Sequence, residues 1–142
     1  LEICLTSNIK TNTFKTFELL NEFINNKNIL EIHVVSSILG DFIRPSVFSY
    51  SVSKNFLELL IENIKDIDKY KNKLYVWKPA HVESKLNENR KPSFLKTNTN
   101  QITKIVSKKN IGGNYYIPPI SIFFTNIAKL SGPLVRWLDK KI

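Results

Sequence analysis

The stretch ILEIHVVS at residues 29–36 is short, apolar and rich in β-branched side chains. A run of this length and composition predicts a buried β-strand. Helical patterns lie on both sides of it, which favours a strand of a parallel sheet. His33 lies within the run, where a histidine is much more often a satisfied sheet residue than a ligand or a base. This strand is the point from which the rest of the fold is predicted.

A helix is predicted on each side of this strand. Upstream, residues at about 9–24 carry apolar side chains near a helical period, namely Ile9, Phe14, Phe17, Leu20 and Ile24. Downstream, a loop at residues 37–45 contains Gly40. Pro45 lies just outside the second helix, and Ser46 is its expected N-cap. This helix runs to about Lys65, and its expected apolar face consists of Phe48, Val52, Phe56, Leu59, Leu60 and Ile64.

The alternation of helix and strand continues along the chain. Residues 73–78 form the next predicted strand, and residues 98–108 form a short helix that turns Ile102, Ile105 and Val106 inward. A brief strand at residues 115–117 precedes two prolines, and an apolar helical segment follows at residues 120–138. This order favours a single α/β domain over residues 1–142 with a parallel sheet and an apolar C-terminal segment at residues 118–142.

Length, charge and cysteine content narrow the classes of protein. The chain has 142 residues, of which 42% are hydrophobic, which is enough for one compact soluble domain. Its formal net charge of +9 comes mainly from lysines spread along the chain, as on a solvated surface. No nucleic-acid-binding motif accompanies this charge, so nucleic acid is not an expected partner. With Cys4 alone and no basic-then-apolar leader, we expect a cytoplasmic protein without disulfides.

Tyr50 and Lys54 form the pair with the clearest chemistry. A spacing of four residues on a helix places both on one face, one turn apart. A free phenol has a pKa of about 10, and a neighbouring ammonium stabilises the phenolate and brings the pKa of a phenol nearer to neutrality. Such a pair can donate and accept a proton, as general acid/base catalysis requires. The alternative is a tyrosine and a lysine on the surface of an amphipathic helix.

Ser37 and Asn8 extend this pair into a larger set. Ser37 lies thirteen residues before Tyr50, at the end of the predicted strand, where its hydroxyl can hold a substrate oxygen. Asn8 lies twenty-nine residues before Ser37, where its amide can hold a water or a backbone kink close to Lys54. Taken singly, Ser37 is typical of a loop cap and Asn8 of an N-cap. Occurring together with the right strand and helix between them, they favour a functional site.

The combined pattern resembles the C-terminal, catalytic half of the short-chain dehydrogenase/reductase family. That family carries Asn, then Ser, then Tyr-x-x-x-Lys, and the chain offers Asn8, Ser37 and the pentad YSVSK at residues 50–54. The Ser-Ser-x-x-Gly spacing at residues 36–40 also matches. The resemblance implies a Rossmann-like, three-layer α/β/α fold with a parallel sheet, here incomplete because the N-terminal βαβ units are missing.

The resemblance also implies a reaction, in which an NAD(P)-dependent oxidoreductase reduces a carbonyl or oxidises an alcohol. Tyr50 would be the general acid/base, and Lys54 would stabilise its phenolate and hold the nicotinamide ribose. Ser37 would orient the substrate oxygen, and Asn8 would support a water relay to Lys54. The cofactor would supply the hydride, while the protein supplies orientation and electrostatics.

A cofactor-binding loop is implied at residues 79–84, where the family has Pro-Gly-x-Val-x-Thr. Pro79 and Val82 match this pattern, whereas Ala80 replaces the glycine and Ser84 replaces the threonine. The glycine-rich turn that binds the pyrophosphate in the family is absent from these residues. We therefore expect a fragment or a truncated product, and the choice between NAD and NADP stays open.

Other functions stay open beside the reductase. Ala80 and the missing glycine-rich turn favour a cofactor-less remnant or interaction module that retains the fold. The net charge of +9 and the apolar tail suggest a basic binder of membrane or nucleic-acid surfaces as a weaker hypothesis. An isomerase or dehydratase of the same superfamily would also use a tyrosine and a lysine.

The expected partners follow from the helix and the tail. The first is a small carbonyl or alcohol, which the apolar segment 118–142 suggests is lipophilic. The second is another copy of the chain, bound through the helix that carries Tyr50 and Lys54. The apolar segment itself is a lid over the pocket, a core or oligomer contact, or a peripheral membrane contact. No metal site is expected.

Overall fold

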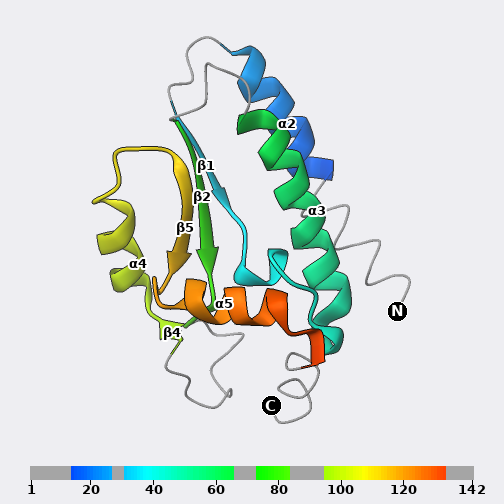
Figure 1. Ribbon diagram of the computed structural model, residues 1–142. Coiled ribbons are helices and arrows are strands. Elements are labelled where there is room, and N and C mark those ends of the chain that lie inside the picture. The colour runs from blue at the N-terminus through cyan, green and yellow to red at the C-terminus, as the bar shows by residue number, and fades with distance from the viewer. Residues whose placement is uncertain (1–13, 27–30, 66–72, 84–94, 134–142) are drawn as a thin grey trace.

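The computed structural model describes residues 14–26, 31–65, 73–83 and 95–133. In the described part, helices and strands alternate as the sequence predicts (Figure 1). The strands β3 and β4 are the elements that the sequence pattern did not reveal. The elements in chain order are α2 (Lys15–Asn25), β1 (Ile32–Val35), the 3-10 helices η2 (Ile38–Gly40) and η3 (Pro45–Val47), α3 (Phe48–Lys65), β2 (Leu74–Pro79), β3 (His81–Val82), β4 (Lys96–Thr97), α4 (Thr99–Val106), β5 (Gly113–Ile117) and α5 (Ser121–Leu130).

Three strands form one parallel sheet in the order β1-β2-β5, which confirms the predicted parallel pairing. Val35 at the end of β1 pairs with Trp77 of β2, and Pro79 at the end of β2 pairs with Ile117 of β5. The three strands therefore finish at one edge of the sheet, toward which the arrows point in Figure 1. β3 and β4 form a separate, two-stranded parallel pair.

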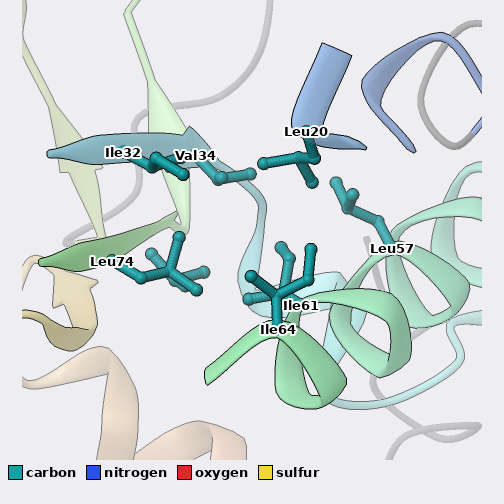
Figure 2. Close-up of a cluster of buried hydrophobic side chains, with 8 residues drawn as sticks. Leu20, Ile32, Val34, Leu57, Ile61, Ile64 and Leu74 are labelled. Atoms are coloured by element: carbon teal, nitrogen blue, oxygen red, sulfur yellow. The ribbon is translucent and has the colours of Figure 1, made fainter. Parts of the chain in front are cut away.

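Helices cover both faces of the sheet. Successive residues of β2 point to opposite sides, and the side chains on each side are buried in a core of their own. On one face, Leu74 and Val76 pack against α2, α3 and β1, as Figure 2 shows for most of this core. On the other face, Tyr75 and Trp77 pack against Ile117 and α4. The fold is therefore α/β, with a small parallel sheet flanked by helices. The first core consists of Leu20, Ile32, Val34, Leu57, Ile61, Ile64, Leu74 and Val76.

Helix α4 begins where its sequence predicts. The side chain of Asn98 accepts a hydrogen bond from the backbone of Gln101, and the Gln101 side chain accepts one from the backbone of Asn98. This reciprocal capping satisfies two N–H groups that the helix itself cannot. The predicted inward residues of α4 are confirmed, since Ile102, Ile105 and Val106 pack against the second core.

The predicted inner face of α3 is wrong, although the helix ends at Lys65 as expected. Among the six apolar residues expected inside, Ile64 is buried, whereas Phe48, Phe56 and Leu59 are exposed. The helix instead turns a partly polar face to the sheet, which consists of Ser51, Ser53, Lys54, Leu57, Glu58, Ile61 and Ile64. These polar groups tolerate burial because they have partners. The Ser51 hydroxyl, for example, accepts a hydrogen bond from the backbone of Arg44.

Two predictions near the start of α3 and α2 also fail. Ser46 does not cap α3, because it lies inside η3, which Pro45 begins and which leads directly into the helix. In α2, Leu20 is buried as expected, but Phe14 and Phe17 are exposed. Residues 9–13 of the predicted helix, which include Ile9, lie outside the described residues.

Strand β1 is buried on one face rather than on both. Ile32 and Val34 are buried, whereas His33 and Val35 are exposed, and Val35 reaches 64%. The reason is that the core on the other face of the sheet is built from residues of β2, β5 and α4 and contains none from β1. His33 is a satisfied sheet residue, as expected. Its ring stacks on Tyr75, and its Nδ1 accepts a hydrogen bond from the Trp77 indole.

Helix α5 lies across the edge where the parallel strands end (Figure 1). It buries Ser121 and Thr125 and leaves apolar side chains such as Phe123 exposed. Within the described ranges, no helix combines the length and apolar character needed to cross a bilayer. The rest of the predicted apolar tail, residues 134–142, lies outside the described residues.

Candidate active site

The first turns of α3 bring Tyr50 and Lys54 together at the carboxyl edge of the sheet. The Nζ of Lys54 lies 5.7 Å from the centroid of the Tyr50 ring. Lys54 is 8% exposed, and its ammonium donates a hydrogen bond to the carbonyl oxygen of Val35 at 3.4 Å. The ammonium therefore lies over the ring of Tyr50, in the placement of a cation–π contact.

Burial governs the ionisation of Lys54. Loss of hydration lowers the pKa of Lys54 below its usual value, and the negative charge of Glu58, one turn further along α3, opposes this shift. A lysine with a lowered pKa is one of the signs of a functional site, although ion pairs in the protein interior also produce such shifts. In this case the lysine lies next to the group whose ionisation it would control.

Ser37 connects the ends of two strands. It is buried just after β1, and its hydroxyl lies within 3.5 Å of the carbonyl oxygen of Pro79, the last residue of β2. The same hydroxyl accepts a hydrogen bond from the backbone of Leu39 and so caps η2. A capping role is therefore established for Ser37. Its hydroxyl is also placed at the edge of the sheet where ligands bind in open α/β folds.

Gly40 lets η2 approach α3 closely. A Cβ atom on Gly40 would lie 2.9 Å from Cγ of Glu58 and 3.2 Å from the carbonyl oxygen of Lys54, which is too close for a side chain. The Asn55 amide also donates a hydrogen bond to the Gly40 carbonyl at 2.8 Å. The turn that follows Ser37 is thus packed directly on the part of α3 that carries Lys54.

The predicted cofactor loop is described only in part. Pro79 ends β2, and the backbone of Ala80 donates a hydrogen bond to the Ile117 carbonyl at 2.9 Å, which continues the pairing with β5. Val82 lies in β3. Ser84 of this loop lies outside the described residues, and so does Asn8, the fourth member of the predicted catalytic set.

A cavity of about 270 Å³ opens beside Lys54, between α2, α3 and the outer side of β1. Leu20, Val35 and Leu57 are among the residues that line it, but Tyr50 and Ser37 are not. The described residues therefore bring Tyr50 and Lys54 together and place Ser37 at the same edge of the sheet. They do not gather all three around one cavity.

A buried group of charges lies next to this site, and the sequence pattern did not predict it. Lys78, Asp41 and Glu58 form ion pairs in the interior, next to the residues described above. One signal was available, namely a lysine at the end of the apolar run LYVW at residues 74–77. A charge in a buried strand requires a buried counter-charge.

Comparisons with known proteins give no relative for the chain. No protein-family model, no curated protein and no solved structure matches it. The family resemblance therefore depends on the residues of the chain and on their arrangement.

Proposed function

We propose that the chain is the catalytic part of an NAD(P)-dependent oxidoreductase of the short-chain dehydrogenase type, which reduces a carbonyl or oxidises an alcohol. The observation that carries the proposal is the buried Lys54 ammonium beside the Tyr50 ring, at the carboxyl edge of a parallel sheet. Ser37 lies at the same edge. This arrangement agrees with a Rossmann-like fold, which forms part of the proposal.

In this proposal Tyr50 moves the proton. The phenol gives its proton to the carbonyl oxygen during reduction and takes it back from the alcohol during oxidation. Lys54 stabilises the phenolate that forms when the proton leaves, and the Ser37 hydroxyl donates a hydrogen bond to the substrate oxygen. A nicotinamide held here by Lys54 would supply the hydride in reduction and accept it in oxidation. Asn8 supports a water relay to Lys54.

The residues present fit the nicotinamide end of such a cofactor. An ammonium has three N–H donors, and among the described residues the Val35 carbonyl is the hydrogen-bond acceptor that Lys54 contacts. The remaining donors can hold ribose hydroxyls. Pro79, Ala80, Val82 and Ser84 would contact the nicotinamide.

The exposed face of α3 supports a second copy of the chain as a partner. Phe48, Phe56 and Leu59 are exposed on this helix, and Leu59 reaches 57%. Apolar side chains that share one helix are typical of a contact surface. The same observation favours the alternative function, an interaction module that retains the fold without using a cofactor.

The proposal is tested by turnover of NADH and NADPH with a panel of carbonyl compounds of increasing chain length. The assay uses the 142-residue chain and, in parallel, the longest reading frame that contains it. Oxidation of one cofactor that depends on a carbonyl substrate supports the proposal, and a preference for long-chain carbonyls supports a lipophilic substrate. If neither protein binds or oxidises either cofactor, the proposal is wrong and the interaction module is favoured.

A further inference from the structure

Lys78 is a buried cation at the meeting point of several elements. It is the penultimate residue of β2, and its side chain is 3% exposed. Its Nζ lies 3.0 Å from Oδ1 of Asp41 and 2.8 Å from Oε2 of Glu58. The same Asp41 oxygen lies 2.9 Å from Nζ of Lys129 on α5. We call these four residues the Lys78 network.

Three of the four residues of the Lys78 network, namely Asp41, Glu58 and Lys78, adjoin a residue of the candidate site. Asp41 follows η2, whose first turn Ser37 caps, and its backbone donates a hydrogen bond to the Ile38 carbonyl. Glu58 lies one helical turn after Lys54. Lys78 itself directly precedes Pro79, whose carbonyl is within hydrogen-bonding distance of the Ser37 hydroxyl. The network therefore joins the turn after Ser37, the helix of Tyr50 and Lys54, and the end of β2.

The charges of the network persist at neutral pH. Burial alone would lower the pKa of Lys78, but the hydrogen bonds and charges of Glu58 and Asp41 outweigh it and raise this pKa. Burial alone would raise the pKa of Asp41, but Lys129 and Lys78 outweigh it and lower this pKa. Both directions favour the charged forms, so Lys78 is protonated and Asp41 is deprotonated at neutral pH.

Stability alone is a weak reason for such a network. Buried ion pairs often contribute no more to folding than apolar residues of the same size, because the charges lose their hydration. Their attested advantage is directional, since each charged hydrogen bond fixes the position of two groups. The location of the Lys78 network fits this directional role. Gly40 brings the turn after Ser37 into close contact with α3, and the network lies at the same contact.

We propose that Lys78 and Asp41 are positioning residues, which hold the turn after Ser37 against α3 and so fix the Ser37 hydroxyl relative to the helix that carries Tyr50 and Lys54. The inference rests on the proposed function, which it deepens by assigning a role to groups that do not touch the substrate. Substitution of either residue loosens the turn, and the reacting groups lose their alignment. A misplacement of about 1 Å can cost on the order of 10²-fold in rate.

The test measures backbone hydrogen exchange and steady-state kinetics in Asp41→Asn, in the full chain. The matched control is Glu18→Gln, which removes an exposed carboxylate from the first turn of α2, away from the network. The amides that report on the turn are those of Leu39, Gly40 and Asp41. We expect their exchange to accelerate roughly tenfold in Asp41→Asn, while amides of α4 are unchanged. In the control, exchange at the turn stays at the wild-type rate.

Kinetics distinguish positioning from a general loss of structure. We expect kcat to fall roughly tenfold in Asp41→Asn while the KM for the nicotinamide cofactor stays within about twofold, because alignment is lost but binding is not. Faster exchange at the turn with an unchanged kcat overturns the positioning role. Unchanged exchange in both Asp41→Asn and Lys78→Met overturns the hold on the turn. If the wild-type protein shows no turnover at all, the proposed function fails. The catalytic purpose of the positioning then fails with it. The exchange data still decide whether the network holds the turn.

Discussion

The ammonium of Lys54 donates a hydrogen bond to the carbonyl oxygen of Val35, across the gap between α3 and the last residue of β1. This contact links the helix to the strand two residues before Ser37. It also takes a charged group into an environment where it is 8% exposed. A contact of this kind has a cost in stability and needs a functional reason.

Lys54→Met is expected to abolish activity and to stabilise the fold. The pKa of Lys54 is lowered by burial, with Glu58 in opposition, so the charged form is less favourable in the folded protein than in the unfolded one. That cost is present at neutral pH and disappears as the pH rises above the unfolded value of 10.5. Removal of the charge should therefore raise the free energy of unfolding at pH 7 by about 1 kcal/mol. Urea denaturation measures this change, with the exposed Lys104→Met as control. A destabilised Lys54→Met would show that Lys54 is a structural residue.

Gly40→Ala is expected to separate η2 from α3. The added Cβ would lie 2.9 Å from Cγ of Glu58 and 3.2 Å from the carbonyl oxygen of Lys54, and the backbone oxygen cannot move aside cheaply. We expect a loss of about 1–3 kcal/mol in the free energy of unfolding. Gly132→Ala is the matched control, since its Cβ would meet no atom of the described residues within 4 Å. Equal stability of the two variants in urea denaturation would contradict the close packing of the turn on α3.

The pH dependence of the free energy of unfolding is expected to reveal the contribution of the Asp41 carboxylate. The pKa of Asp41 is lowered from its usual 3.8, because the opposing effect of burial is outweighed by Lys129 and Lys78. Its contribution to stability is therefore complete above about pH 4 and is lost as the pH falls through its lowered folded pKa. Asp41→Asn should be less stable than the wild type by about 2–4 kcal/mol at pH 7.

Between pH 2 and pH 9, the difference in the free energy of unfolding between these two proteins should shrink only under acid conditions. At alkaline pH, the ionisation of Lys78 matters instead. Its pKa is raised above 10.5, so its contribution to the free energy of unfolding is present below pH 10.5 and is lost as the pH rises through the pKa of the folded protein. Burial raises the pKa of the neighbouring Tyr116 to about 12, with the charge of Lys78 in opposition, so this phenol stays neutral through the same range. Urea denaturation at a series of pH values from 2 to 9 checks this account. A constant difference between wild type and Asp41→Asn down to pH 2 would show that the ion pairs do not stabilise the fold.

The local patterns in the sequence predicted the elements well, because the dominant cue was hydrophobic periodicity. The apolar run that begins at Leu74 is typical of a buried strand, and the capping residue Asn98 is typical of a helix start. The strand β2 and the helix α4 therefore lie close to where they were expected. The strands β3 and β4 are each only two residues long. A strand this short shows no detectable alternation of apolar and polar residues.

The orientation of α3 could not be predicted from hydrophobicity, since polar side chains occupy its inner face. Glu58 is buried because Lys78 comes from a strand twenty residues away, and such a pairing becomes visible only in three dimensions. Of the candidate site, the proximity of Tyr50 and Lys54 was predictable from their spacing on one helix. The lysine that ends the run at residues 74–77 signals a buried charge, and Ser37 is typical of a loop cap, but the partners of both residues depend on contacts between elements.

In the proposed reaction, Tyr50 transfers the proton. The most direct test compares kcat/KM for carbonyl reduction between the wild type and Tyr50→Phe. Tyr115→Phe is the matched control, because it removes a hydroxyl that bonds to the Ile111 carbonyl, on a strand residue stacked against Trp77. Loss of a general acid typically costs about 10²–10⁴-fold in rate. We predict a loss of this size in Tyr50→Phe and a change of less than about threefold in Tyr115→Phe. Equal kcat/KM values for Tyr50→Phe and the wild type would contradict the account.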